Sequence, residues 1–161
     1  MADFRPAPEL DVTEWLNTPE PLSLSKLRGR VVVIEAFQML CPGCAQMALP
    51  QLARVQEQFG RTGVAVLGLH TVFEHHETQG PRSALEAFLR EYRYTFPVGI
   101  DRPSPQGRGM PVTMAAYRME GTPTLILVDR QGRLRRQAFG HMPDLQLGAE
   151  IMALIAERDA G

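Results

Sequence analysis

The amino-acid sequence predicts an α/β fold, in which a central mixed β-sheet has helices on both faces and an N-terminal extension precedes it. Two segments with the composition of buried strands, 31–37 and 64–71, are each followed by a segment with helical periodicity. This alternation is typical of a parallel βαβ unit. Residues 124–139 then have the pattern of a β-hairpin, and a last helical pattern follows. A parallel half and a hairpin together predict a mixed sheet.

The length of 161 residues fits one domain with a real core, which we predict to cover residues 1–161. We divide it into an N-terminal extension, 1–30, and a core, 31–157. The composition is 44% hydrophobic and 22% charged, with a formal net charge of -1. This balance argues against nucleic acid or an anionic membrane as a partner bound through bulk charge. No apolar run approaches the roughly 18 residues that cross a bilayer, so we expect no membrane partner.

The N-terminal segment, MADFRPAPELD, is acidic and lacks the basic and apolar regions of a signal peptide. We therefore expect a cytoplasmic protein, or a periplasmic one if a signal was removed. The chain contains 2 cysteines, which excludes a secreted scaffold held together by several disulfides. In a reducing cytosol, a single Cys-x-x-Cys pair is more often catalytic or metal-binding than structural.

Local patterns predict the first elements. Leu22, Leu24 and Leu27 are expected to anchor the proline-rich extension on the edge of the domain. The segment 31–37, VVVIEAF, is apolar at both odd and even positions, as expected of a central strand covered on both faces. The segment 64–71, VAVLGLHT, is predicted to be a second buried strand of the same kind.

Two amphipathic helices are predicted next. The first follows the cysteines and ends at Gly60. Its apolar stripe consists of Ala48, Leu52, Val55 and Phe59. The second begins at Pro81, and Ser83 and Glu86 have the spacing of a capping box. Its apolar stripe consists of Leu85, Phe88, Leu89 and Tyr92.

The C-terminal part is predicted to be a hairpin covered by a helix. Residues 129–132, DRQG, form the turn, where the glycine is available for a positive φ. The last helix starts near Asp144. It is expected to bury Leu147, Ile151, Leu154 and Ile155.

Both cysteines of the chain, Cys41 and Cys44, follow the first strand and open the first helix. A helix N-terminus carries unsatisfied N–H groups and about half a positive charge, which favour a thiolate over a thiol. Pro42 suits the first turn because it has no N–H to satisfy. The two-residue gap lets the sulfur atoms meet across one turn. This pattern therefore predicts a disulfide that forms and reopens without unfolding of the protein.

The segments VVVIEAFQMLCPGC and GTPTLILVDRQGRL together resemble the thioredoxin-like superfamily, and LSLSKLRGRVVVI is similar to the lead-in of its TlpA/ResA branch, often grouped with AhpC/TSA-type redoxin domains. The resemblance covers about residues 7–157. It implies a thioredoxin-like fold and thiol–disulfide exchange, with Cys41 as the exposed nucleophile and Cys44 as the resolving thiol. It also implies protein or small-molecule thiol and disulfide substrates, a redox partner, and no cofactor.

The family pattern also implies roles for three further residues. The segment GTPT places Thr122 and Pro123 where the family has a cis-proline facing the disulfide, so the backbone of Thr122 is expected to bind a substrate strand. Glu35 stands where thioredoxins carry a buried carboxylate. Burial should raise its pKa, and Glu35 is then expected to accept the proton of Cys44 during catalysis.

The sequence departs from the family pattern at two positions near the cysteines. Leu40 stands before the nucleophile, where relatives usually have Trp. Pro50 comes six residues after Cys44, where the usual distance is five. Both changes affect the surface that partners recognise, whereas the cysteines that perform the exchange are present.

Three other functions compete with this interpretation. The sequence argues against a peroxiredoxin, because the Pro-x-x-x-Thr-x-x segment that should precede its reactive cysteine is absent. Cys41 and Cys44 could instead form a zinc site with His70, His75 and His76, which follow the second strand. The third alternative is a redox switch that binds a partner without turnover. We expect no bound metal, because Cys41 must stay free to attack.

Overall fold

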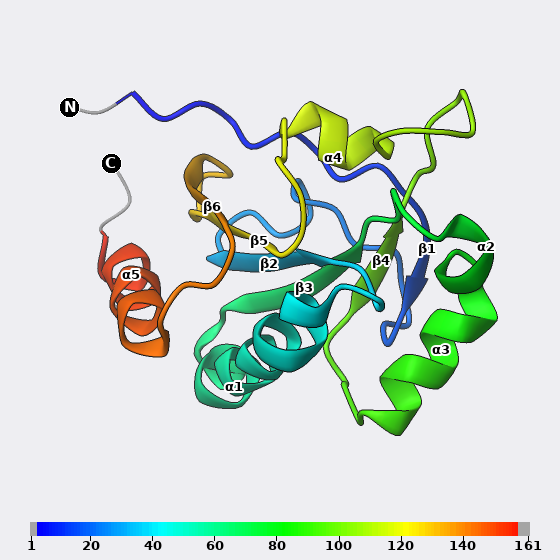
Figure 1. The fold of residues 1–161 in the computed structure, drawn as a ribbon. Helices are drawn as coiled ribbons and strands as arrows, with labels where there is room; N and C mark the ends of the chain where they lie inside the picture. The colour runs from blue at the N-terminus through cyan, green and yellow to red at the C-terminus, as the bar shows by residue number, and fades with distance from the viewer. Residues whose placement is uncertain (1–2, 158–161) are drawn as a thin grey trace.

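Six strands form one mixed sheet with the order β1-β4-β3-β2-β5-β6 in the computed structural model of the protein (Figure 1). The structure describes residues 3–157, so residues 1–2 and 158–161 of the predicted domain lie outside the described part. The strands are β1 (Val12–Leu16), β2 (Val32–Phe37), β3 (Ala65–His70), β4 (Val98–Asp101), β5 (Thr124–Val128) and β6 (Leu134–Phe139). β2, β3 and β4 run parallel, whereas β1, β5 and β6 pair antiparallel with their neighbours. The predicted α/β fold with a mixed sheet is confirmed.

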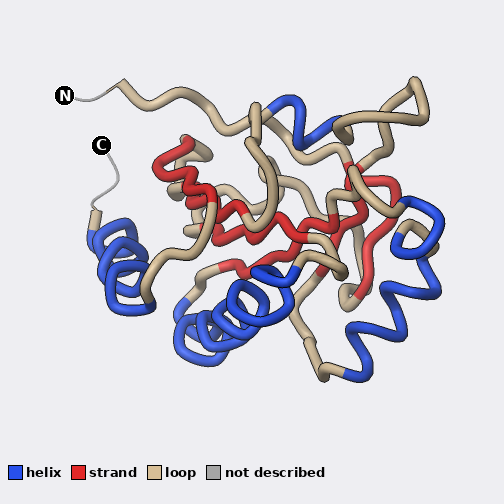
Figure 2. The backbone as a smooth tube through the Cα atoms, in the orientation of Figure 1, coloured by secondary structure: helices blue, strands red, loops and turns tan. Residues whose placement is uncertain are grey.

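Helices cover both faces of this sheet, and the strands form the middle layer (Figure 2). The helical segments are η1 (Cys44–Ala48), α1 (Leu49–Phe59), η2 (Gly60–Thr62), α2 (His76–Gln79), α3 (Arg82–Glu91), α4 (Val112–Ala116) and α5 (Asp144–Ala156). α1, α3 and α5 pack on one face, where they enclose a core cluster that includes Cys44. α4 and the N-terminal extension pack on the other face, where Leu24 and Leu27 are buried as anchors.

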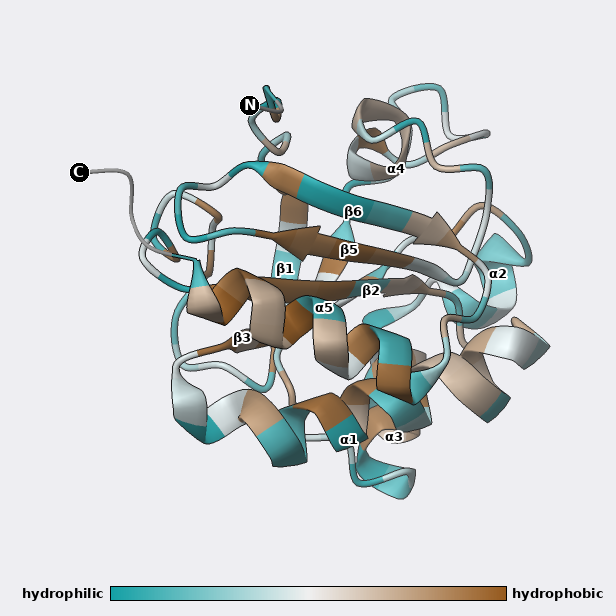
Figure 3. Cartoon of the chain, turned by 90° about the vertical axis from the view of Figure 1, so that its left-hand side faces the viewer, coloured by the Kyte–Doolittle hydropathy of each residue, from teal (hydrophilic) through white to brown (hydrophobic). Residues whose placement is uncertain are grey.

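β2 is buried along its whole length, as its apolar pattern predicts. Val31, Val33 and Phe37 belong to the cluster under α1, while Ile34 and Ala36 belong to the opposite cluster. In Figure 3, β2 and β5 are largely hydrophobic, whereas the edge strand β6 is mostly hydrophilic. The strand that leads to the cysteines is therefore fixed in the core on both of its faces.

Two details of the predicted helices are wrong. The capping box at Ser83 does not form, because Pro81 takes the N-cap position and no side chain caps the helix. Tyr92 lies at the C-cap of α3 and is 58% exposed, so it is not part of the buried stripe. The hairpin turn is as predicted, with Gly132 at a φ of 78°.

The N-terminal extension contributes more than anchors, because its segment Val12–Leu16 forms the edge strand β1. This strand pairs with β4, and Val12 lies opposite Asp101. None of the helices formed by the described residues is long and apolar enough to cross a membrane.

Candidate active site

Cys41 and Cys44 form a disulfide at the carboxyl end of β2, with their Cα atoms 5.2 Å apart. The helix begins at Pro42 directly after Cys41. Cys44 is fully buried, whereas Cys41 is partly exposed. The backbone N–H of Cys44 donates to Sγ of Cys41 at 3.3 Å. The sulfur of Cys41 therefore lies at the positive end of a helix, which stabilises the thiolate that forms when the disulfide opens.

A π-turn over Cys44–Ala48 explains the unusual position of Pro50. The N–H of Leu49 donates to the carbonyl oxygen of Cys44, five residues earlier, where a regular α-helix spans four. The turn therefore contains one residue more than an α-helical turn. Pro50 follows in the first turn of α1.

The peptide bond between Thr122 and Pro123 is cis, as the family resemblance implied. The carbonyl oxygen of Thr122 lies 3.5 Å from Sγ of Cys41. A β-carbon placed on Gly43 would lie 3.5 Å from Cδ of Pro123, so the proline ring packs against the Pro42–Gly43 segment. This loop is therefore adjacent to the disulfide.

Glu35 lies in the middle of β2 and is only 2% exposed. Because side chains alternate along a strand, Glu35 faces the same side of the sheet as Val33 and Phe37, which is the side that contains Cys44. Its Oε1 atom has no hydrogen-bond partner among residues 3–157. Burial raises the pKa of Glu35 well above its usual range, because water no longer stabilises the charged form.

The histidines are not gathered around the sulfur atoms. His70 is buried beneath the helices with its ring 5.1 Å from that of Phe37, and burial lowers its pKa to about 4. His75 and His76 are exposed. Within the described residues, no group of three or more His, Cys, Asp or Glu side chains is placed to hold a metal ion. The alternative zinc site therefore has no geometric support.

Two buried glutamines lie beside the cysteines, and they were not predicted from the sequence. Gln38 directly follows β2, and Gln79 is the last residue of α2. They bond to each other and to the loops around the disulfide. The sequence does contain a signal for Gln38, because it is a polar residue between an apolar strand and the Cys-x-x-Cys motif.

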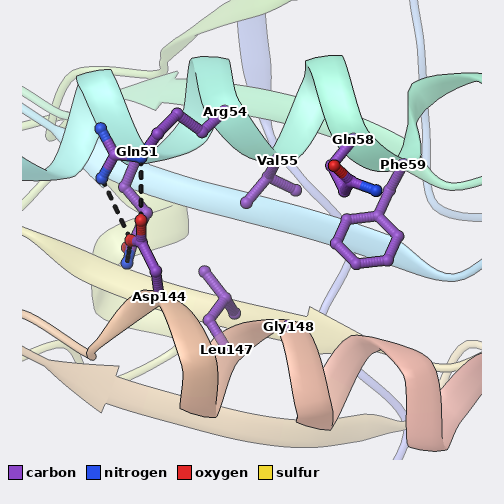
Figure 4. Close-up of a pocket in the computed structure, with 8 residues that line it drawn as sticks. All are labelled: Gln51, Arg54, Val55, Gln58, Phe59, Asp144, Leu147 and Gly148. Carbon is purple, nitrogen blue, oxygen red and sulfur yellow. Dashed lines mark hydrogen bonds and ion pairs between the residues drawn. The ribbon is translucent and has the colours of Figure 1, made fainter.

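A separate pocket of about 290 Å³ lies between α1 and α5 and contains neither cysteine. Figure 4 shows that Asp144 reaches across it to Gln51 and Arg54. Val55, Phe59 and Leu147 form its apolar lining. This pocket lies at the interface of two packed helices, and it is distinct from the site of the sulfur atoms.

A mixed sheet of this topology, with a Cys-x-x-Cys disulfide at the start of a helix and a cis-proline beside it, defines the class of thioredoxin-like thiol–disulfide oxidoreductases. Residues 5–150 match the Redoxin family model. The chain belongs to the redoxin family, which confirms the resemblance seen in the sequence.

Solved structures and curated relatives agree with this assignment. A crystal structure of a thioredoxin-like superfamily protein is 52% identical, with a TM-score of 0.92, and the match covers 96% of this chain and 98% of that one. A thiol-disulfide isomerase from Corynebacterium glutamicum is 46% identical, with a TM-score of 0.89 and coverage of 95% and 97%. Protein DipZ of Mycobacterium tuberculosis is 31% identical over 83% of this chain, which spans only 18% of that relative's length.

Proposed function

We propose that this protein exchanges its Cys41–Cys44 disulfide with cysteines of protein substrates, and that Cys41 forms the mixed disulfide. The observation that carries the proposal is the asymmetry of the pair. Cys41 is partly exposed and its sulfur accepts the N–H of Cys44, while Cys44 is fully buried. An incoming sulfur atom can therefore reach only the first cysteine.

In the reducing direction, the thiolate of Cys41 attacks one sulfur of a substrate disulfide. A new S–S bond forms, and the other substrate sulfur leaves as a thiolate. Cys44 then loses its proton and attacks Sγ of Cys41, which releases the first substrate sulfur and forms the Cys41–Cys44 disulfide. Two electrons pass from the cysteine pair to the substrate, and a redox partner returns them. The oxidising direction is the reverse sequence.

Glu35 is the proposed acceptor for the proton of Cys44. It lies on the same face of the sheet as Cys44, and burial holds its pKa above its usual range. A carboxylate whose pKa is closer to that of a thiol is a better proton acceptor for it. After the second step, Glu35 carries the proton until the next cycle.

The proposed substrate is an extended polypeptide that lies along Thr122 and Pro123, since the carbonyl oxygen of Thr122 is next to Sγ of Cys41. Leu40, where relatives usually have Trp, is 51% exposed and borders an apolar pocket of about 370 Å³ that also includes Ala45 and Phe88. The cytoplasmic location expected from the sequence is part of this proposal. A reducing cytosol would keep the pair as the dithiol, whereas a periplasmic location, expected if a signal was removed, would favour the disulfide.

Trapping tests the roles of the two sulfur atoms. The reduced Cys44→Ser variant, mixed with a disulfide-bonded peptide, should accumulate a mixed disulfide that mass spectrometry detects. Cys41→Ser should not accumulate it, because its remaining thiol is buried. Equal trapping by both variants, or by neither, contradicts the assignment. A redox switch without turnover would instead react once with the peptide disulfide. It would not continue to reduce excess peptide when a thiol reductant is supplied.

A further inference from the structure

Gln38 and Gln79 form a buried amide pair beside the disulfide. The two side chains are 2% and 1% exposed. Nε2 of Gln79 donates to Oε1 of Gln38 at 3.1 Å, across 41 positions of sequence. A buried amide needs all its donors and acceptors paired, so its contacts show which segments it holds.

The amide of Gln38 holds two loops that border the site. Its Oε1 atom also accepts the backbone N–H groups of Phe73 and Glu74, both at 3.1 Å. Its Nε2 atom donates to Oγ1 of Thr122 at 3.3 Å. Thr122 is the residue whose carbonyl oxygen lies 3.5 Å from Sγ of Cys41. One side chain therefore connects the end of β2 with the loop that faces the sulfur.

The amide of Gln79 holds the backbone just before the nucleophile. Its Oε1 atom accepts the N–H of Leu40 at 3.0 Å, and Leu40 immediately precedes Cys41. Its Nε2 atom also donates to the carbonyl oxygen of Glu74 at 2.7 Å. The pair thus fixes three segments relative to one another: 38–41, 73–79 and Thr122.

We propose that Gln38 and Gln79 act as one positioning unit, which sets the distance and orientation of the Cys41 sulfur relative to the Thr122 loop. This role rests on the proposed exchange function. Amides suit it because they are neutral at every pH of interest, whereas a carboxylate at the same place would oppose the thiolate of Cys41. Every polar atom of the pair has a partner, so the unit has one preferred arrangement.

The test replaces each glutamine with methionine, which keeps the length of the side chain and removes its hydrogen bonds. Gln51→Met is the matched control, because Gln51 is equally buried at 3% exposure and donates to the carbonyl oxygen of Met142 at 2.6 Å, away from the sulfur atoms. Misplacement of a reacting group by 1 Å can cost about 10²-fold in rate. For a loosened loop we expect about a tenfold slower exchange with a disulfide-bonded peptide in Gln38→Met and Gln79→Met.

A second measurement follows alkylation of Cys41 by iodoacetamide as a function of pH. Without the amide pair, Sγ of Cys41 should lie farther from the N–H of Cys44, which stabilises the thiolate. The pH profile of alkylation should therefore shift to higher pH in Gln38→Met and Gln79→Met and stay in place in Gln51→Met. The double variant should be no slower in exchange than the slower single variant, since the two side chains form one unit. If Gln79→Met does not fold, Gln79→Asn takes its place, because it keeps a neutral amide that is one methylene too short for the same hydrogen bonds and should still shift the profile upward.

Two results would overturn the positioning role. One is an unmoved alkylation profile in the variants of Gln38 and Gln79, and the other is an equal shift in Gln51→Met. The alkylation measurement needs no disulfide substrate. If the wild-type protein fails to exchange with peptide disulfides, the proposed function is therefore wrong, while the profile still decides the role of the amide pair.

Discussion

Glu35 and Asp101 are both buried carboxylates, and their surroundings differ sharply. Asp101, at the end of β4, is 3% exposed and accepts the N–H groups of Thr113 and Met114 at 2.8 and 3.0 Å, and the hydroxyl of Thr71 at 2.9 Å. Glu35, in the middle of β2, is 2% exposed, and its Oε1 atom has no partner in the described part of the chain. Burial raises the pKa of both groups, but in Asp101 the hydrogen bonds oppose this effect.

The difference separates a structural carboxylate from one available for chemistry. Asp101 accepts two backbone N–H groups in the first turn of α4, so this carboxylate holds the start of that helix. An ionised carboxylate without such donors is costly in the interior, so Glu35 retains a proton to higher pH. Because Glu35 faces the cluster that contains Cys44, its proton exchange can serve the sulfur chemistry.

The largest effect is expected for Glu35→Gln, which keeps the shape and removes the titration. If Glu35 accepts the proton of Cys44, exchange with a peptide disulfide should slow by about 10²-fold, the low end for general acid–base catalysis. The free energy of unfolding, measured in urea at pH 7, should stay the same or increase, because a desolvation cost is removed. Unchanged exchange together with clear destabilisation would show that Glu35 belongs to a structural ion pair.

Asp101→Asn should have the opposite signature. An amide offers one acceptor oxygen to three donors and presents its own NH₂ group to them, so one or more buried donors lose a partner. We expect a loss of about 2 kcal/mol in the free energy of unfolding, with no change in the exchange rate. Slowed exchange in this variant at intact stability would remove the distinction between the two carboxylates.

The third test is the pH dependence of stability that Glu35 contributes. Its pKa is raised in the folded state, so its contribution is fully present below the unfolded pKa of about 4.3 and is lost as the pH rises through the folded pKa. Relative to Glu35→Gln, the wild type should therefore lose stability with rising pH, by at most about 1.4 kcal/mol per pH unit. Urea unfolding of both proteins between pH 4.5 and 8 measures the difference, and a gain with rising pH would contradict the unpaired state of Glu35.

The parts of the fold that rest on strong local patterns were predictable. β2 and β3 are continuous apolar runs, the hairpin has its glycine turn, and the cysteines stand between a strand and a helix. The cis bond before Pro123 was predicted from the family resemblance, because spacing alone does not distinguish cis from trans.

The missed elements are short and depend on distant partners. β1 contains Thr13 and Glu14 and becomes a strand by pairing with β4, whose own four residues include a glycine. α2 and α4 have four and five residues, too few for a periodic pattern. The bond between Gln38 and Gln79 was not visible either, since it joins two isolated polar residues through the folded chain.

The π-turn at Cys44–Ala48 has a consequence for how this helix accepts a change in length. One added residue in a regular α-helix rotates everything beyond it by about 100°, which would turn Leu52 and Val55 away from the sheet. The wider turn absorbs that rotation, so both residues remain buried while Cys44 keeps its place under Cys41. The sulfur-bearing end and the packing end of the helix are thus out of phase with each other by one residue.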